Sequence, residues 1–198
     1  TGVESDVWLT ADGIPVLHHD RKVGAVLRKR AISSLKRDEL PSHVPALSDL
    51  YAVTGPDFPI SLDIKDVAAF GPTVEVARAI GSTAESNLWL CHPDLAELTK
   101  WRPQTSAQLI NSVRLQSLPS GLERRAAELQ QLGLDGLNLF HNEWEGGRVT
   151  LLHRFELYAL GWGAQHSREV AEIVDMGIDA IFSDYVDRMM AVINEYYR

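Results

Sequence analysis

The sequence predicts an α/β fold with a parallel sheet, and three observations predict it. Short apolar segments of strand length recur along the chain, segments with helical spacing separate them, and glycine or proline marks many of the joins. Strand–helix alternation implies helical crossovers between parallel strands, so we expect a TIM-type (β/α)8 barrel with seven of its eight strands in this chain. The predicted strands begin at Val3, Ile60, Leu88, Ala107, Gly136, Leu157 and Ala180.

The segments between these strands fit helices by their apolar spacing. After an opening hairpin, a helix is expected over residues 32–40, and a second one opens at Pro45 and ends at Gly55. The basic stretch 21–30 is typical of a solvated surface loop. No linker or change of composition divides the chain, so a single domain over residues 1–198 is expected. The later helices are expected over residues 72–80, 93–100, 119–132, 147–154, 167–176 and 187–197.

The composition is that of a globular protein with an acidic balance. Of the 198 residues, 45% are hydrophobic and 23% are charged, and the formal net charge is -8. This charge argues against a nucleic-acid partner, because binding to a phosphate backbone needs a basic face. An anionic substrate must therefore meet a local cation. No apolar run approaches the roughly 20 residues that cross a bilayer, so we expect no integral membrane segment and a cytoplasmic location. The single cysteine, Cys91, is expected to be buried on its strand.

The stretch Val3–Asp20 places two carboxylates on one face of the first strand. Strand side chains alternate, so Glu4 and Asp6 project from the same side. Two carboxylates on an inner face repel each other unless a cation lies between them. After a tight turn, a second apolar run carries His18 and His19 back over the end of this strand, and only one of the two can face the carboxylates. The pattern predicts a metal site beside a proton donor or acceptor; a soluble edge hairpin is the alternative.

The residues from Glu4 to Asp20, E-S-D-V-W-L-T-A-D-G-I-P-V-L-H-H-D, resemble the signature of the glycerophosphodiester phosphodiesterase family. The match is long and has no gaps. The resemblance implies a TIM barrel of the phospholipase C-like phosphodiesterase type, metal binding by Glu4 and Asp6, and acid/base catalysis by His19. It also implies a divalent cation, Mg²⁺ or Ca²⁺, as cofactor and a small phosphodiester as substrate.

Two later segments extend the resemblance. The motif S-L-D-I-K is similar to the family's I-E-x-K, which implies that Asp63 is the third metal ligand and that Lys65 contacts phosphate. A simple ion pair between these two residues is the alternative. Aspartate is one methylene shorter than the family's glutamate, a change that hard cations tolerate. Trp162, in L-Y-A-L-G-W-G-A-Q, resembles the start of the family's W-T-V-N, which implies a ring that lines the substrate cleft; a core tryptophan is the alternative.

One part of the family pattern is missing from this chain. In the family the E-x-D strand is the second one, and a strand ending in H-R-G and a helix precede it; the sequence contains no H-R-G. An open barrel leaves two unpaired edges, so we expect the missing unit to exist in the native polypeptide, cleaved or supplied by another chain. If the chain starts at Thr1, it lacks the second acid/base histidine, and its activity is expected to be lower by about 10²-fold or more.

The function that the resemblance implies is metal-dependent hydrolysis of glycerophosphodiesters to sn-glycerol 3-phosphate and an alcohol. Three other functions stay open. A sphingomyelinase D-like or other lipid phosphodiesterase would be separated by assays with choline lipids. A catalytically impaired binding module of the same fold would bind no divalent ion and turn over no glycerophosphodiester. An unrelated barrel enzyme would have a site that does not converge on Glu4, Asp6 and Asp63.

Overall fold

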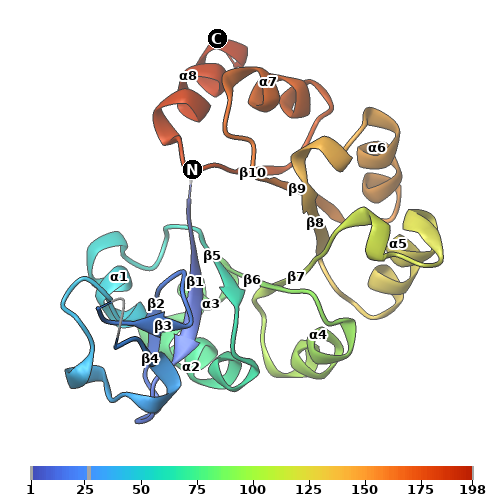
Figure 1. Ribbon diagram of the computed structural model, residues 1–198. Helices are drawn as coiled ribbons and strands as arrows, with labels where there is room; N and C mark the ends of the chain where they lie inside the picture. Colours follow the sequence, from blue (N-terminus) through green and yellow to red (C-terminus); the bar gives the residue numbers. More distant parts are fainter. Residues whose placement is uncertain (1, 26–27, 198) are drawn as a thin grey trace. The chain divides into compact units, whose positions relative to one another are not determined.

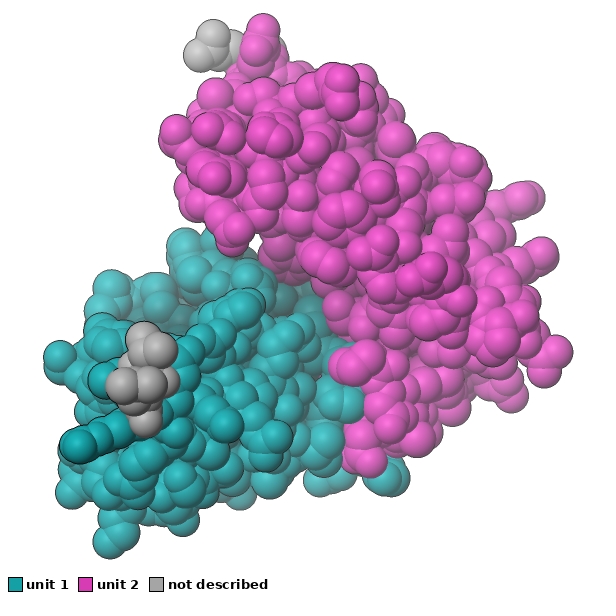
Figure 2. Space-filling view, viewed as in Figure 1, with its two compact units in different colours: residues 1–92, 100–108 teal, residues 93–99, 109–198 magenta. Residues whose placement is uncertain are grey.

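The structure is a computed structural model that describes residues 2–25 and 28–197. Its contacts divide the chain into two compact units, shown in two colours in Figure 2. Unit 1 comprises residues 1–92 and 100–108, and unit 2 comprises residues 93–99 and 109–198. Each unit contains parallel strands separated by helices, which confirms the predicted α/β class.

Unit 1 is organised around its first strand. The strands are β1 (Val3–Leu9), β2 (Pro15–Leu17), β5 (Ile60–Ile64) and β6 (Leu88–His92), and the helices are α1 (Leu47–Thr54), α2 (Phe70–Ile80) and α3 (Ser82–Ser86). The strand order is β6-β5-β1-β2 (Figure 1), with β1 parallel to β5, β5 parallel to β6, and β1 antiparallel to β2. Four of the five positions of β5 are buried, which is typical of a parallel strand covered on both faces.

Unit 2 repeats strand and helix in strict alternation. The strand order is β10-β9-β8-β7, and β8 runs parallel to both of its neighbours. Gly136 opens β8 so close to β9 that a Cβ atom there would lie 2.7 Å from the carbonyl oxygen of Tyr158, so only glycine fits. The strands are β7 (Gln108–Ser112), β8 (Gly136–Phe140), β9 (Tyr158–Trp162) and β10 (Ala180–Phe182), and the helices are α5 (Gly121–Gln131), α6 (Gly146–Arg154), α7 (Ser167–Asp175) and α8 (Val186–Tyr196).

Most of the predicted elements are confirmed. All seven predicted strands begin within one residue of the expected position, and the later helices, with α4 (Leu95–Trp101), match within two. α1 ends as predicted at Gly55, whose φ of 76° is favoured only for glycine. Within the described residues, no helix has the length and apolar character needed to cross a membrane.

The segment between β2 and α1 differs from the prediction. In place of a helix over residues 32–40 it forms two 3₁₀ turns, η1 (Ile32–Ser34) and η2 (Arg37–Glu39). The turn between β1 and β2 takes the backbone groups that a helix would use internally: the Leu35 carbonyl accepts from the Ala11 amide at 2.8 Å, and Asp12 accepts from the Arg37 amide at 3.1 Å. The apolar side chains of this segment form a core cluster with Val16 of β2; its other members are Val23, Ile32, Leu35, Leu40, Val44 and Ala46.

The basic stretch 21–30 is also not a plain loop. It contributes a short antiparallel pair, β3 (Lys22–Val23) and β4 (Arg30–Ala31), and Val23 is buried in the core cluster described above. Residues 26–27 of the predicted loop lie outside the described residues. The sequence also gave no indication of α3, which follows Gly81 directly.

Glu85 anchors α3 to the segment that precedes β7. Its side chain is buried and accepts hydrogen bonds from the guanidinium of Arg78 at 2.6 and 2.9 Å, from the Thr105 hydroxyl at 2.8 Å and from the Ser106 amide at 3.1 Å. The hydrogen bond from Arg78 is the largest cause that lowers the pKa of Glu85 to about 2, against the opposing effect of burial. The ionised carboxylate therefore stabilises the fold.

Glu85→Gln is expected to lower the free energy of unfolding at neutral pH by about 2 kcal/mol, since a hydrogen bond to a charged group contributes about 1.5–3 kcal/mol. The folded-state pKa lies below the ordinary 4.5, so this stabilisation is present above pH 4.5 and is lost as the pH falls towards about 2. Urea denaturation of both proteins across this range should show the difference shrinking with acid. A difference that is constant with pH would contradict the assigned role.

Candidate active site

Acidic side chains gather on one face of β1 and β5. In the parallel register Glu4 lies opposite Ser61, and Asp6 lies opposite Asp63. Glu4 and Asp6 share one face, as expected from strand alternation. Paired residues of parallel strands project from the same face, so Asp63 lies on that face as well. Asp6 is buried, Asp63 is partly buried and Glu4 is exposed.

Lys65 joins the two opposed carboxylates. Its ammonium group lies 2.6 Å from Oδ2 of Asp63 and 3.2 Å from Oδ1 of Asp6. The ion pair between Asp63 and Lys65 that the sequence left as an alternative is therefore present, and it extends to Asp6. The Lys65 side chain is 35% exposed, so one side of the cation faces solvent. A cation between two carboxylates is what their repulsion requires.

Burial and the oppositely charged partner have opposite effects on the pKa values of Asp6 and Lys65. Burial raises the pKa of Asp6, the charge and hydrogen bond of Lys65 lower it, and the neighbouring Asp63 raises it; the net pKa lies above the ordinary 3.8. Burial lowers the pKa of Lys65, but its hydrogen bond to Asp63 and the charges of Asp63 and Asp6 outweigh burial, so the net pKa lies above 10.5. The ammonium is therefore firmly protonated, whereas the ionised form of Asp6 is held at a cost.

The predicted ligands have the chemistry that a hard divalent cation prefers, but their side chains are not grouped around one position. Mg²⁺ and Ca²⁺ prefer carboxylate oxygens, which Glu4, Asp6 and Asp63 supply. Among residues 2–25 and 28–197, however, no three His, Cys, Asp or Glu side chains are grouped closely enough to hold a metal ion. The structure brings Asp6 and Asp63 together through Lys65. A divalent ion would therefore need Lys65 to move away from the two aspartates.

The two adjacent histidines differ in their surroundings. His18 is partly buried, and its Nδ1 lies 3.0 Å from the amide nitrogen of Asp20, a contact that fixes the turn. The His19 side chain is 92% exposed and its Nδ1 lies 3.1 Å from Oδ1 of Asp20. The charge of His19 is among the causes that lower the pKa of Asp6, although the smallest of them. Of the pair, His19 is the one whose charge acts on Asp6, and its ring is open to solvent.

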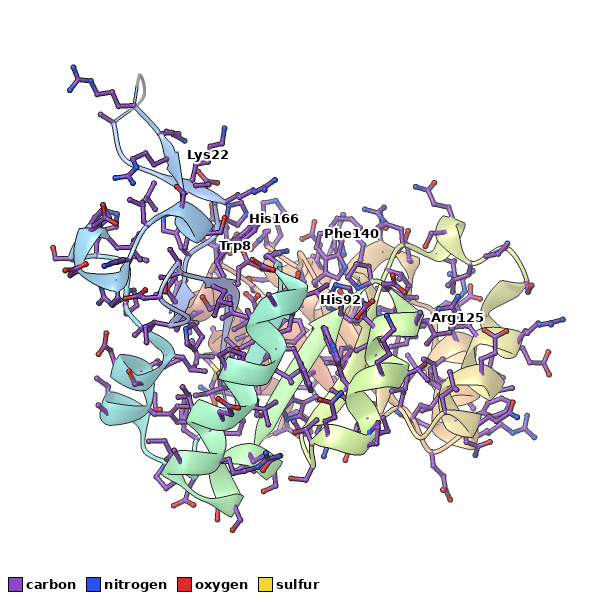
Figure 3. All side chains as sticks on the ribbon, turned by 90° about the horizontal axis from the view of Figure 1, so that it is seen from below. Trp8, Lys22, His92, Arg125, Phe140 and His166 are labelled. Carbon is purple, nitrogen blue, oxygen red and sulfur yellow. The ribbon has the colours of Figure 1, made fainter. Side chains whose placement is uncertain are left out.

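The strand next to β5 adds buried side chains to the same unit. Cys91 lies opposite Asp63 in the register, and its thiol is 3.7 Å from the Ser61 hydroxyl. Burial raises the pKa of Cys91 to about 12, so this thiol is the inert, buried side chain that the sequence predicted. His92, labelled in Figure 3, ends β6. Its ring lies 5.0 Å from that of Trp101, so it packs against an aromatic side chain.

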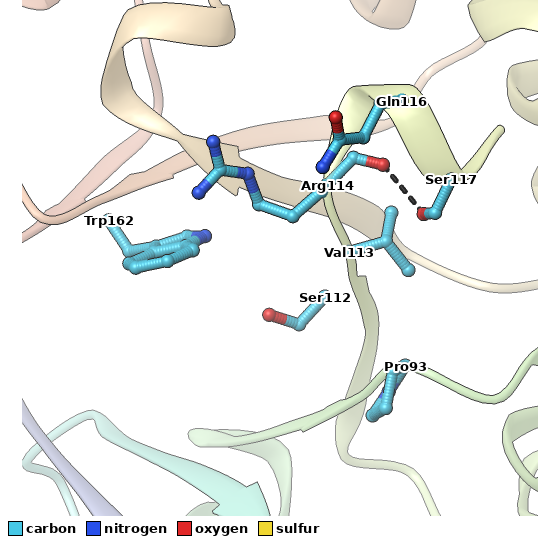
Figure 4. Close-up of a pocket in the computed structure, with 7 residues that line it drawn as sticks. All are labelled: Pro93, Ser112, Val113, Arg114, Gln116, Ser117 and Trp162. Atoms are coloured by element: carbon cyan, nitrogen blue, oxygen red, sulfur yellow. Dashed lines mark hydrogen bonds between the residues drawn. The ribbon is translucent and has the colours of Figure 1, made fainter.

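In unit 2 the predicted Trp162 ends β9 in an aromatic group. Its ring lies 4.8 Å from that of Phe140, edge to face, and 5.7 Å from the guanidinium carbon of Arg114. The indole is partly exposed and lines a pocket together with Ser112, Arg114 and Gln116 (Figure 4). The structure therefore does not support the alternative that Trp162 is a buried core residue.

Arg114 is the charged residue of this pocket, and the sequence did not indicate it. It follows β7 in a short loop, and its partner Glu143 lies 29 residues further along the chain. The only sequence observation that points to it is its place just after the carboxyl end of a predicted strand, where barrel enzymes carry their functional residues.

Parallel strands with helical crossovers, and charged side chains towards the carboxyl ends of these strands, define an α/β enzyme of the TIM-barrel type. Solved structures share this fold. A Silicibacter pomeroyi protein assigned as a glycerophosphoryl diester phosphodiesterase matches with a TM-score of 0.84 and 16% identity over 98% of this chain and 83% of its own. An Oleispira antarctica phosphodiesterase, solved in complex with the product sn-glycerol-3-phosphate, matches with a TM-score of 0.81 and 20% identity, over 98% and 85%. A Thermotoga maritima glycerophosphodiester phosphodiesterase matches with a TM-score of 0.78 and 20% identity, over 96% and 84%.

The comparison of sequences gives the family. The profile of the glycerophosphoryl diester phosphodiesterase family matches residues 1–188, whereas no curated protein matches the chain significantly. The chain belongs to the glycerophosphoryl diester phosphodiesterase family and is an enzyme of the phosphoric diester hydrolase class.

Proposed function

We propose that the protein hydrolyses glycerophosphodiesters to sn-glycerol 3-phosphate and an alcohol with the help of a divalent cation, Mg²⁺ or Ca²⁺. The observation that carries the proposal is the opposed pair Asp6 and Asp63 with Lys65 between them, on a chain that matches the family over residues 1–188. The product bound to the Oleispira antarctica phosphodiesterase, sn-glycerol-3-phosphate, supports the same product here.

Each predicted residue has a distinct part in this reaction. Asp6 and Asp63, with Glu4, would hold the cation, which supplies positive charge that neutralises phosphoryl oxygens. The ammonium of Lys65, protonated and partly exposed, binds a non-bridging oxygen of the phosphate. A water oxygen forms a bond to phosphorus as the bond to the alcohol oxygen breaks. His19 either removes the proton of that water or gives a proton to the departing alcohol.

The other functions considered from the sequence gain no support. The family match and the solved structures point to glycerophosphodiesters rather than to sphingolipids. No observation supports a second chain that completes the barrel. Lys65 lies between the two aspartates because adjacent carboxylates need a cation between them. This position of Lys65 therefore does not by itself indicate a catalytically impaired binding module.

The test is release of sn-glycerol 3-phosphate from glycerophosphocholine and glycerophosphoethanolamine by the full-length protein, with and without a chelator. We expect turnover that the chelator removes and that Mg²⁺ or Ca²⁺ restores. His19→Asn is expected to lower kcat by about 10²–10⁴-fold, the usual contribution of a positioned proton-transfer group, and His43→Asn is the matched control. Turnover that is insensitive to the chelator, or an unchanged kcat in His19→Asn, would contradict the proposed roles.

A further inference from the structure

Unit 2 contains a pocket of about 390 Å³ (Figure 4), a volume typical of sites for small molecules. All of its lining residues belong to unit 2, so the pocket is described within one compact unit. Among these lining residues, which all lie in the described part of the chain, Arg114 is the one that carries a charge. The whole chain has a net charge of -8, so a pocket with a positive wall differs in charge from the protein around it.

The positive charge of this pocket is accessible, whereas the carboxylate that pairs with it is not. The Arg114 side chain is 44% exposed and that of Glu143 is 13% exposed. Nε of Arg114 donates to Oε1 of Glu143 at 2.9 Å. Oε2 of Glu143 accepts from the backbone amides of Leu115 and Phe140 at 3.2 and 3.3 Å. Because both carboxylate oxygens have partners inside the protein, a ligand in the pocket meets the cation.

The guanidinium of Arg114 is fixed in a way that leaves its terminal nitrogens for a ligand. Its carbon lies 4.7 Å from the centre of the Phe140 ring and 5.7 Å from that of the Trp162 ring, at cation–π distance from both. The backbone is held as well, since the Arg114 carbonyl accepts from the amide and the hydroxyl of Ser117 at 2.9 and 2.6 Å. Within residues 2–25 and 28–197, neither terminal nitrogen of Arg114 has a hydrogen-bond partner. These two nitrogens form a planar fork that matches the oxygens of an oxyanion.

Two polar side chains on either side of Arg114 in the sequence add further donors. The Ser112 hydroxyl oxygen accepts from the side-chain amide of the buried Asn138 at 3.1 Å, which leaves the hydroxyl hydrogen to be donated. Across the residues that the structure covers, no acceptor is found for this hydrogen or for the side-chain amide of Gln116. Figure 4 shows the Ser112 hydroxyl and the Arg114 guanidinium on the same side of the pocket as the Trp162 ring. The wall thus offers a cation and several donors but no acidic side chain.

We propose that this pocket binds a terminal phosphate group, either free phosphate or the phosphate of a monoester. Such a group carries close to two negative charges at neutral pH and three acceptor oxygens. The fork of Arg114 binds two of these oxygens, and the donors of Ser112 and Gln116 bind the third. A carboxylate has only two oxygens and a phosphodiester only one charge, so each satisfies fewer of the donors. The ring of Trp162 packs against the organic part of a monoester. The proposal concerns unit 2 alone and does not depend on the proposed hydrolysis.

An NMR titration observes this pocket directly, because the indole of Trp162 forms part of its wall. The full chain, labelled with ¹⁵N, is titrated in metal-free buffer of constant ionic strength with inorganic phosphate and with sn-glycerol 3-phosphate. Trp162→Phe identifies the resonance among those of the five tryptophans. We expect the Trp162 indole resonance to shift and to saturate with both compounds. Equal affinities would assign free phosphate as a sufficient ligand, and tighter binding of sn-glycerol 3-phosphate would assign a monoester.

Variants of Arg114 test the source of the affinity. Arg114→Gln should weaken the binding of both compounds by about tenfold to a hundredfold, the usual effect of losing charged hydrogen bonds. Arg114→Lys keeps the charge but not the fork and should lose less. Arg124→Gln removes an equal charge from a side chain on α5 that is 72% exposed, and it should bind as wild type does. If Arg114→Gln does not fold, Ser112→Ala decides, because it removes a donor from the same wall without touching Glu143 and must weaken binding.

Three results would overturn the proposal. The first is a Trp162 resonance that does not respond to phosphate, or that responds with the same affinity in Arg114→Gln. The second is equal affinity for dimethyl phosphate, a diester with a single charge, which should bind about tenfold more weakly if a terminal phosphate is recognised. The third is calorimetric binding of phosphate that persists in Arg114→Gln but disappears in Lys65→Met, since the anion would then bind in unit 1. Absence of hydrolysis in the assays above would leave all of these results unchanged.

Discussion

Asp6→Asn should lower kcat/KM by about 10²–10³-fold and at the same time raise the free energy of unfolding. The loss of activity is of the size seen when one group that stabilises transition-state charge is removed. The gain in stability follows from the position of Asp6, which is buried opposite Asp63 and has a pKa raised by that burial. Single stabilising substitutions commonly raise the free energy of unfolding by about 0.5–2 kcal/mol.

The pH dependence of this gain has a definite sign. The folded-state pKa of Asp6 lies above the ordinary 3.8, so the folded protein binds this proton more tightly than the unfolded chain does. The cost of ionised Asp6 is therefore fully present above the raised pKa and disappears as the pH falls below 3.8. Urea denaturation at about pH 7 should show the variant as the more stable protein, and at about pH 3.5 the two should converge. Asp38→Asn, at an exposed position, is the control, and a variant less stable than wild type at neutral pH would contradict this account.

Strand alternation was enough to predict the common face of the site. Glu4 and Asp6 were expected on one face because strand side chains alternate. Asp63 was added through the family resemblance, and the register of β1 and β5 places it on the same face. Alternation says nothing about how far a flexible side chain reaches. The ammonium of Lys65 reaches both Asp6 and Asp63 on a four-carbon stem. Its position depends on side-chain torsions, which are set only once the two strands are paired.

The parts of the protein that the sequence did not indicate depend on contacts between distant segments. Residues 32–40 have helical spacing, but their backbone groups bond to the turn between β1 and β2, and the contact with Asp12 overrides local propensity. Arg114 has no motif, and its orientation comes from Glu143 and Phe140 on another strand and loop. Local pattern therefore predicted the strands and the acidic face, whereas the pocket beside Arg114 required the fold.

Lys65→Met should destabilise the protein by about 2–3 kcal/mol, somewhat less than the 3–5 kcal/mol typical of breaking a fully buried ion pair, since Asp63 and Lys65 are partly exposed. Methionine keeps the length of the apolar stem but removes the cation that joins Asp6 to Asp63. The two aspartates would then repel each other, and the pKa of Asp6 would rise further because the charge and hydrogen bond that lower it are gone. Activity should fall with the loss of the phosphate contact.

Lys65→Met also tests whether the Lys65 ammonium and a divalent ion compete for the same position between Asp6 and Asp63. Once Lys65 is removed, Mg²⁺ or Ca²⁺ has no competitor between the aspartates, so the melting temperature of Lys65→Met should rise with millimolar divalent ion and return to its low value with a chelator. Wild-type protein, in which the ammonium already fills this role, should respond less. Lys22→Met, at an exposed position on β3, is the control for the loss of one positive charge. If Lys65→Met were as stable as wild type and indifferent to divalent ions, the two carboxylates would not be a cation site, because the parallel pairing of β1 and β5 would then be enough to keep them opposite each other.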